Sequence, residues 1–255
     1  MMKILKKLVC ILVFATVAWA ENPHEHRGFY FGTGLGVSYL SSALNVNDFY
    51  FSSGVGQRNL DGIYEENRHY SEHHRKERFS GFGFPSLDFR FGASFANLLT
   101  FYFNFRGGLY SGEGKIYKED YNVDRVYLDE ILNQEDRGLV GKFDRKDDAY
   151  AFYGAFGLGF TVYPFRNPAS PMYGFYVGVA GGADASVARV NALANNISGS
   201  MGIFTRYEIG KEWWVSDTWA IGVGFDFTVE VYGNNNDGDD GDCHTINLFL
   251  RLTHG

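Results

Sequence analysis

Residues 29–39 read Phe29-Tyr30-Phe31-Gly32-Thr33-Gly34-Leu35-Gly36-Val37-Ser38-Tyr39. The odd positions hold Phe, Phe, Thr, Leu, Val and Tyr, whereas the even positions hold Tyr, three glycines and Ser. Because successive side chains of a β-strand point to opposite faces, this alternation predicts a strand with a different environment on each face. Seven further segments alternate in a similar way, so the predicted strands lie near 28–40, 82–95, 98–111, 149–163, 173–187, 201–214, 219–232 and 244–253.

The connections between these strands alternate in length. Three are short (96–97, 164–172 and 215–218), and four are longer and polar (41–81, 112–148, 188–200 and 233–243). Outer-membrane barrels have short periplasmic turns and long extracellular loops. The sequence therefore predicts an all-β fold: a closed antiparallel transmembrane β-barrel of eight strands, with long extracellular loops near 41–81 and 112–148 and both termini in the periplasm. A hairpin hidden in either long loop would raise the count to ten.

The first twenty residues are typical of a secretory signal peptide. Lys3, Lys6 and Lys7 precede a short apolar run, and Ala18-Trp19-Ala20 matches a cleavage site. The mature chain is expected to span 21–255, and the loss of three lysines takes its formal charge from −7 to about −10. Such acidity argues against nucleic acid as a partner. Cys243 is then the single cysteine, which excludes an intramolecular disulfide.

The two faces of the predicted strands differ in charge. Lys211 is the single charge on the rows expected to face outward, which are otherwise rich in Phe, Leu, Ile and Val. A charge facing lipid costs roughly 2–4 kcal/mol at the bilayer midplane, whereas opposite charges inside a narrow barrel pair with each other. The inward rows are expected to form a salt-bridged network in the lumen from Asp88, Arg90, Arg106, Arg206, Glu208, Glu212, Asp226, Glu230 and Arg251, with Asp184 nearby.

Two alternatives accompany this interpretation. Periodicity does not say which face is outside, and a soluble barrel of lipocalin type would turn the apolar rows inward. Volume argues against it, because the phenylalanines of 101–105 and their neighbours are too bulky for the interior of an eight-stranded barrel. The charged network is either a plug that stabilises a closed lumen or the lining of a gated pore, and a narrow interior favours the plug.

Aromatic residues are expected at the ends of the strands. Trp213 and Trp219 flank the predicted turn at 215–218, and Tyr39 and Tyr173 lie near other strand ends. Such residues form girdles at both interfaces of membrane barrels, although Trp and Tyr also have a general preference for strands. We interpret these four residues as interface aromatics.

Two segments carry a resemblance to a known family. The stretch 28–36 (Gly-Phe-Tyr-Phe-Gly-Thr-Gly-Leu-Gly) and the strand–turn–strand 210–219 (Gly-Lys-Glu-Trp-Trp-Val-Ser-Asp-Thr-Trp) resemble the small outer-membrane β-barrel family that includes the OmpA barrel domain and OmpX-like proteins. The resemblance implies an outer-membrane location, contact with outer-membrane lipids and lipopolysaccharide, and insertion by the barrel assembly machinery. The chain departs from many members in lacking a terminal aromatic residue, because it ends Leu252-Thr253-His254-Gly255.

Some side chains are weak candidates for metal ligands. The i, i+4 spacing of His69 and His73 suits one face of a helix and a zinc or nickel ion. Asp237 and Asp239 lie in the acidic stretch 234–242, which suits calcium in composition but not in the register of a calcium loop. A solvated loop and a flexible acidic hairpin tip are the better interpretations, so no metal or cofactor is predicted.

The sequence points to architecture more strongly than to activity. We expect a non-enzymatic integral outer-membrane protein with a structural and surface-interaction role, whose loops contact an extracellular ligand. A small passive pore for ions or small solutes is the alternative. A lipid A-modifying enzyme is a third hypothesis, since Ser200 and His244 lie near predicted outer strand ends, but no spacing in the sequence brings them together.

Overall fold

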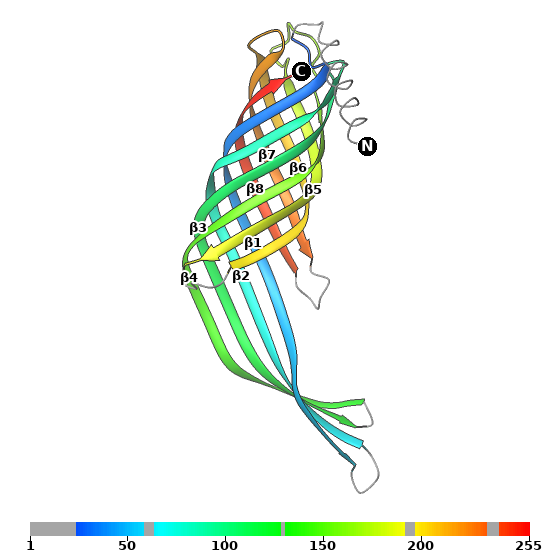
Figure 1. Cartoon of the computed structure of the whole chain (residues 1–255), viewed down its shortest axis with the longest axis vertical. Coiled ribbons are helices and arrows are strands. Elements are labelled where there is room, and N and C mark those ends of the chain that lie inside the picture. Colours follow the sequence, from blue (N-terminus) through cyan, green and yellow to red (C-terminus); the bar gives the residue numbers. More distant parts are fainter. Residues whose placement is uncertain (1–23, 59–63, 129–130, 192–196, 234–239) are drawn as a thin grey trace, which may run out of the picture.

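Eight antiparallel strands pair in chain order, and the last pairs with the first, which closes the sheet into a barrel (Figure 1). The computed structural model describes residues 24–255 except 59–63, 129–130, 192–196 and 234–239. The expected signal peptide at 1–20 lies outside these residues. The strands are β1 (Gly28–Arg58), β2 (Tyr64–Phe95), β3 (Leu99–Leu128), β4 (Ile131–Val162), β5 (Phe175–Val190), β6 (Ile197–Trp214), β7 (Trp219–Gly233) and β8 (Asp240–His254).

The strand count and the three short connections agree with the sequence prediction. These connections lie at one end of the barrel, called here the short-turn end. Both ends of the described chain meet there, because His24 N donates to Asp217 O at 3.0 Å and Gly255 N donates to Thr218 O at 3.2 Å. Figure 1 shows the opposite end of the barrel continuing into a long curved sheet.

The predicted long loops at 41–81 and 112–148 are wrong as loops, because most of their residues are strand. The first strand pairs with β8 as far as Asn45, and β4 pairs with β5 only from Ala149 onward. Beyond these points β1–β4 continue as a four-stranded sheet, named here the extension (46–58, 64–75, 117–128 and 131–148). Its length is roughly 40 Å at about 3.3 Å per residue.

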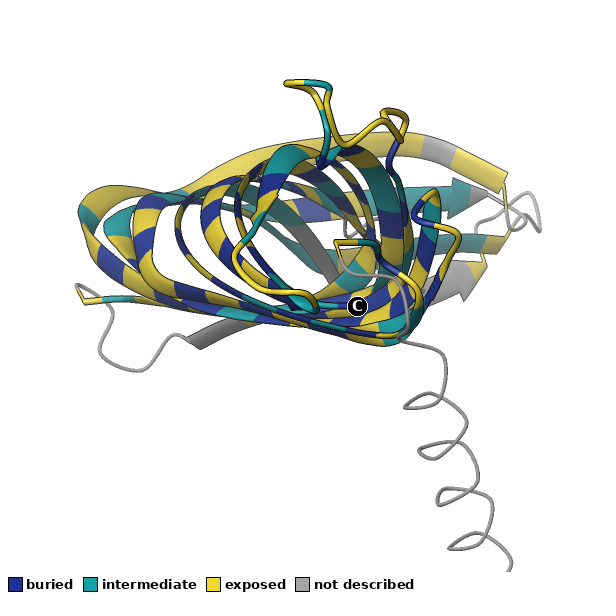
Figure 2. Ribbon diagram, turned by 90° about the horizontal axis from the view of Figure 1, so that it is seen from above, coloured by how far each residue is buried: buried dark blue, intermediate teal, exposed yellow. Residues whose placement is uncertain are grey.

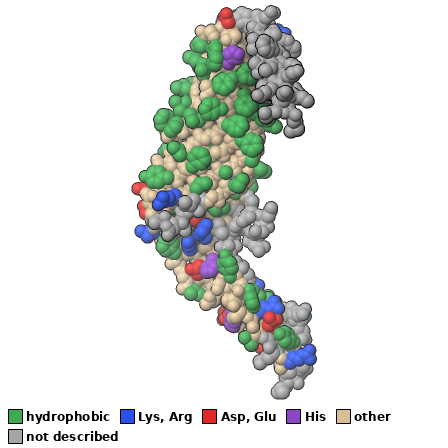
Figure 3. Space-filling view, viewed as in Figure 1, with side chains coloured by type: hydrophobic (Ala, Val, Ile, Leu, Met, Phe, Trp, Pro, Cys, Tyr) green, Lys and Arg blue, Asp and Glu red, His purple; other side chains and the backbone are tan. Residues whose placement is uncertain are grey.

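Side chains alternate between buried and exposed along every wall strand, as the alternating colours of Figure 2 show. The exposed side chains of the barrel wall are apolar: Phe103 is 52% exposed, Leu158 59% and Leu250 68%. Figure 3 shows hydrophobic side chains over the barrel and charged ones gathered toward the extension. A soluble protein rarely exposes so wide an apolar surface. The lipocalin-type alternative is therefore excluded, because the apolar rows face outward.

The outer wall also contains aromatic contacts between neighbouring strands. The ring of Phe91 stacks 5.7 Å from those of Phe103 and Phe105, and Phe105 stacks 6.2 Å from Phe156. Cross-strand pairs of this kind stabilise a sheet by about 0.2–1 kcal/mol each. Among the residues described, no helix is long and apolar enough to cross a bilayer.

The extension has little apolar core. Cation–π contacts on one of its faces provide part of the packing that holds its strands together. Four tyrosine rings, one on β2 and three on β3, lie under a cation from a neighbouring strand. The distances from cation to ring centroid are 4.6 Å for Arg68 over Tyr127, 5.2 Å for Arg125 over Tyr70, 4.1 Å for Arg137 over Tyr121 and 5.0 Å for Lys142 over Tyr117. Contacts of this kind at exposed sites contribute about 0.5–1 kcal/mol each.

We expect the extension to loosen in acid before the barrel does. The guanidinium of Arg68 lowers the pKa of Glu66, and the hydroxyls of Tyr117 and Tyr121 lower the pKa of Glu119. A carboxyl whose folded pKa is lowered stabilises the fold above its unfolded pKa, and this contribution is lost as the pH falls through the folded pKa. Hydrogen exchange, corrected for intrinsic rates, should therefore accelerate in 64–75 and 117–128 between pH 7 and pH 3. Equal protection at both values would contradict this.

Candidate functional site: the polar lumen

The inside of the barrel contains a layer of charged side chains at its middle. Buried residues of β2, β3, β6, β7 and β8 supply them: Asp88, Arg90, Arg106, Arg206, Glu208, Asp226 and Arg251. Each is at most 6% exposed. The strand alternation that puts Phe and Leu outside puts these charges inside, where they pair with each other rather than facing lipid.

Two bidentate ion pairs cross the full width of the lumen. Arg90 on β2 donates to both carboxylate oxygens of Glu208 on β6, at 2.7 and 2.5 Å. Arg106 on β3 donates to both oxygens of Asp226 on β7, at 2.8 and 2.6 Å. In a ring of eight strands, β2 lies opposite β6 and β3 lies opposite β7. These pairs therefore bridge opposite walls of the barrel.

Asp88 lies between these bridges. Arg90 Nε donates to its Oδ2 at 2.7 Å, and the amide of Asn104 donates to its Oδ1 at 2.9 Å. Arg106, Arg206 and Arg251 approach it at 3.8, 3.7 and 3.4 Å. One carboxylate thus compensates several arginines. Since removal of one partner leaves an uncompensated buried charge, the members of this layer depend on each other.

Neutral side chains complete the layer. Glu208 accepts from the hydroxyls of Tyr102 at 3.1 Å and Thr161 at 2.9 Å, and Arg251 donates to the hydroxyl of Tyr176 at 2.7 Å. Arg206 differs from the other arginines. It is fully buried near the ring of Phe204, at 5.2 Å, and among the described residues none of its side-chain nitrogens has a hydrogen-bond partner.

Glu212 belongs to a second polar group, at the short-turn end, and shares no hydrogen bond with the central layer. Its carboxylate lies 2.8 Å from His26 Nε2 and accepts from Tyr163 at 3.1 Å. The His26 backbone is held by Asn97, whose amide N donates to His26 O at 3.0 Å. The sequence interpretation missed His26, because it precedes the first strand and no alternation marks it as inward.

Glu230 likewise lies apart from the central layer, toward the extension. It accepts from the hydroxyl of Tyr232 at 2.8 Å, and its neighbours are the Asp184 carboxyl and the Cys243 thiol. Neither Asp184 oxygen has a hydrogen-bond partner among the described residues. The single network expected from the sequence is therefore three separate polar groups along the barrel axis. The cause is tertiary: inward positions on one strand are about 6.6 Å apart, so residues on the same face reach different depths.

The four expected interface aromatics lie at the two ends of the apolar band. Trp213 is half exposed, with Lys211 Nζ 5.5 Å from its ring, and Trp219 contacts His254 edge to face at 4.9 Å. Tyr173 also lies at the short-turn end and accepts from Asn97 Nδ2 at 3.0 Å. Tyr39 lies toward the extension against Phe82, at 5.1 Å. 

Lys211, the one charge expected among the outward rows, reaches backbone oxygens at the short-turn end. Its Nζ donates to Pro171 O at 2.8 Å and to Tyr173 O at 2.7 Å. The aliphatic stem thus crosses the wall surface while the ammonium is held beyond it, which is how long cationic side chains avoid a hydrocarbon environment.

The helical geometry assumed for His69 and His73 is wrong, because both lie in β2. Four residues along a strand place them about 13 Å apart, too far to share one ion. Each pairs instead with an aspartate across the strand: His69 with Asp124, and His73 Nδ1 with Asp120 at 2.6 Å. Within the described part of the chain no cluster of three metal-binding side chains occurs. Asp237 and Asp239 lie outside it.

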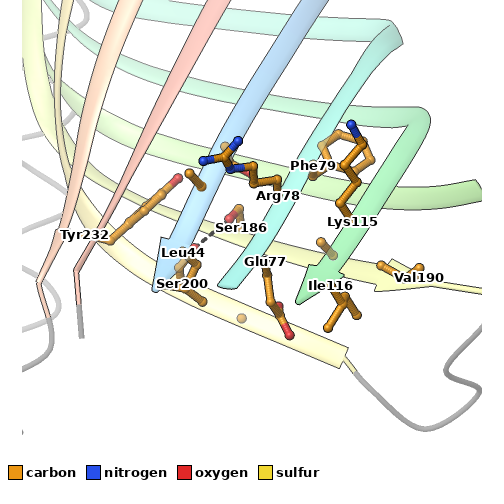
Figure 4. A pocket seen from close by; sticks show the side chains of 14 residues that line it. Leu44, Glu77, Arg78, Phe79, Lys115, Ile116, Ser186, Val190, Ser200 and Tyr232 are labelled. Carbon is orange, nitrogen blue, oxygen red and sulfur yellow. Dashed lines mark hydrogen bonds between the residues drawn. The ribbon is translucent and has the colours of Figure 1, made fainter. Parts of the chain in front are cut away.

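Ser200 and His244, the candidate pair for a rim hydrolase, are not brought together. Ser200 faces the mouth of the barrel and bonds the hydroxyl of Ser186 at 2.7 Å, as Figure 4 shows. The cavity there has a volume of about 40 Å³, room for water but not for a lipid chain. His244 lies between two buried residues of β8, so its side chain is on the outer face of the strand. There its ring stacks on that of Phe227, with 6.0 Å between the ring centroids.

Comparisons with known proteins find only distant structural likeness. No family model matches the chain, and no curated protein matches it. Similar solved structures include OprG from Pseudomonas aeruginosa, with 10% identity, coverage of 91% of this chain and 98% of that one, and a TM-score of 0.38. Neisserial surface protein A has 10% identity, 89% and 96% coverage and a TM-score of 0.38. The outer membrane protease OmpT from Escherichia coli has 10% identity, 89% and 96% coverage and a TM-score of 0.33. 

Similarity at such low TM-scores does not identify the protein class. The geometry of the chain itself identifies it. Eight antiparallel strands close the barrel wall without an edge. The outside of the wall is apolar, and the buried charges at the middle of the barrel lie inside it. Only a closed sheet satisfies every backbone group of strands that cross lipid. An apolar outer band, a polar interior and aromatic ends are the properties of outer-membrane barrels. The protein is a closed, eight-stranded, antiparallel transmembrane β-barrel of the bacterial outer-membrane type.

Proposed function

We propose that this protein is a non-conducting structural barrel that displays its extension at the cell surface for interaction. The observation that carries the proposal is the pair of bidentate bridges, Arg90–Glu208 and Arg106–Asp226, across the whole lumen. Opening a path for ions would require both bridges to break, and each broken bridge takes a bidentate partner from two buried charges. A layer of this kind stabilises a closed barrel rather than lining a channel.

The extension supports a surface role. About two fifths of β1, β2 and β3, and just over half of β4, lie beyond the last pairing with β8 and β5, where they contribute nothing to the barrel wall. Its ion pairs and cation–π contacts order it as a sheet, so it presents a defined surface. We place the short turns and both termini in the periplasm and the extension outside, because outer-membrane barrels keep short turns on the periplasmic side.

The outer surface of the barrel wall indicates the other partners in this proposal. The apolar band contacts outer-membrane lipid, and lipopolysaccharide meets the band at the extension end. The acidic surface of the chain favours divalent cations between the two, because both are negatively charged. The barrel assembly machinery inserts a closed sheet of this kind into the outer membrane.

Single-channel recording tests the proposal. We expect no discrete conductance steps from the mature protein in a planar bilayer once its insertion has been verified by the band shift of the folded form. The variant that carries both Arg90→Ala and Arg106→Ala removes one partner of each bridge and is the control for an opened lumen. Steps in the unmodified protein that change size with Glu208→Gln would overturn the proposal and make the protein a small passive pore.

A further inference from the structure

The polar group of the lumen that lies toward the extension has an excess of negative charge. It contains two carboxylates, Asp184 on β5 and Glu230 on β7, which are 4% and 0% exposed. Among the ion pairs of the described residues, none includes either of them. The arginines of the central layer pair instead with Asp88, Glu208 and Asp226, so four arginines there face three carboxylates. The two acids near the extension therefore have no counter-charge from that layer.

An apolar ring separates this acid pair from Arg206, the arginine on the same side of the lumen. Along the inner face of β6, Phe204 lies between Gly202, which is opposite Asp184 in the strand ladder, and Arg206. Phe204 is itself opposite Glu230, and the Arg206 guanidinium lies 5.2 Å from the centroid of its ring. The ring therefore keeps the Arg206 guanidinium on the side of the central layer.

Gly202 allows the two acids to approach each other from either side of β6. In the strand ladders it is opposite Asp184 of β5 on one side and Tyr232 of β7 on the other. The ring of Tyr232 lies over it, because a Cβ at Gly202 would be 2.5 Å from Tyr232 Cδ1. The Tyr232 hydroxyl donates to Glu230 at 2.8 Å, and the polar neighbours of the Asp184 carboxyl are Glu230 and Tyr232. The two carboxylates are therefore close together.

Several buried oxygen atoms of this group have no hydrogen-bond partner among the described residues. They are both carboxylate oxygens of Asp184, Oε1 of Glu230 and the hydroxyl of Tyr153. Tyr153 on β4 is 1% exposed and interacts electrostatically with both carboxyls. Buried polar atoms are almost always paired in proteins, and a buried carboxylate without a counter-charge is strongly unfavourable. Oxygen atoms from three strands thus favour a positively charged partner at this place.

The size and the chemistry of the group limit what this partner is. The cavity of about 40 Å³ at the barrel mouth includes Ser186, Ser200 and Tyr232 in its lining (Figure 4), and Ser186 follows Asp184 on the inner face of β5. Such a space admits a small ion and excludes an organic ammonium compound. Zinc prefers several nitrogen or sulfur ligands, whereas carboxylate and hydroxyl oxygens suit calcium, whose two charges balance two carboxylates.

We propose that Asp184 and Glu230 bind one calcium ion inside the mouth of the barrel, with the Tyr153 hydroxyl and water as further ligands. Calcium takes neutral oxygens as well as carboxylates, so two acids are enough where the described residues contain no cluster of three metal-binding side chains. The ion offsets the charge of the pair and joins β5 to β7 across β6. It therefore stabilises the end of the barrel from which the extension leaves.

Titration calorimetry with calcium chloride tests the site. The full mature protein is refolded in phosphatidylcholine vesicles, so that no anionic lipid competes for the ion. Asp184→Asn removes one ligand charge at nearly constant volume, and Asp144→Asn, an exposed acid of the extension, is the matched control. We expect Asp184→Asn to weaken calcium binding at least about tenfold and Asp144→Asn to leave it unchanged. Equal binding by the two variants, or no binding by the unmodified protein, would overturn the proposal.

Thermal unfolding with and without calcium separates a bound ion from a proton shared by the two acids. In a chelator, Asp184→Asn should unfold at a higher temperature than the unmodified protein, because it removes one of two like charges. In calcium the order should reverse, and Glu230→Gln should behave in the same way. The other titratable groups facing the pair, Tyr153, Tyr232 and the Cys243 thiol, stay neutral in acid. If calcium changed nothing and the unmodified protein became more stable as the pH fell, a shared proton would replace the calcium site.

Discussion

Arg106→Ala should lower the free energy of unfolding of the barrel by about 3–5 kcal/mol, the usual cost of removing one partner of a buried ion pair. Arg106 is 5% exposed and provides two of the hydrogen bonds of Asp226. Without it, Asp226 keeps the amide of Asn247 at 2.7 Å but loses the cation that donates to both of its carboxylate oxygens. Urea titration of the protein refolded in lipid vesicles, followed by tryptophan fluorescence and by the gel shift of the folded form, measures the loss.

The control for this prediction is Arg145→Ala, which removes an exposed arginine from β4 in the extension. Its effect should stay within about 0.5 kcal/mol, as for most surface substitutions. Adding Asp226→Asn to Arg106→Ala should recover part of the loss, because the second change removes the orphaned charge. If Arg106→Ala and Arg145→Ala were equally stable, the Arg106 guanidinium would not be desolvated and the lumen would contain bulk water.

Gly92→Val should prevent formation of the closed barrel altogether. A Cβ at Gly92 would lie 1.8 Å from the backbone oxygen of Phe101 and 2.7 Å from the Cα of Tyr102. These atoms belong to the backbone of β3, which pairs directly with β2 at this position. No rotation of a side chain relieves the contact, so the two strands would have to separate and lose ladder hydrogen bonds. The measurement is the yield of folded, heat-modifiable protein after refolding into lipid.

Gly107→Val is the matched control. The nearest atom to a Cβ at Gly107 is the backbone oxygen of Tyr153 at 3.7 Å, which is an ordinary contact distance. This variant should refold with the yield of the unmodified protein, because valine also favours strands. Normal folding of Gly92→Val would mean that β2 and β3 are farther apart than described, and the packing of the inner wall would need revision.

The barrel wall could be predicted from the sequence because its two faces meet different solvents. Alternation reports a difference in environment, and along 29–39 lipid lies on one side and a polar lumen on the other. The same argument explains the failure at 41–81 and 112–148. Both faces of the extension meet water, so its strands have charged and aromatic residues on each face, and no period of two distinguishes them from a polar loop.

The candidate site was predictable only in part. Alternation indicated which arginines and acids face inward. It did not indicate how deep in the barrel each side chain lies, or which residue across the lumen it pairs with. The pairing of Arg90 with Glu208 joins residues from strands on opposite sides of the ring, and the barrel closure sets that distance. His26 enters the site from outside any strand, held by Asn97 and Glu212.

The sequence by itself determined the class of the protein, the number of strands, the short turns and the face of each wall residue, because these depend on local alternation and on turn residues. The tertiary structure alone decided the three polar groups of the lumen and the length of β1–β4. Those features depend on which strands become neighbours, and pairing between residues far apart in the chain leaves no local signal.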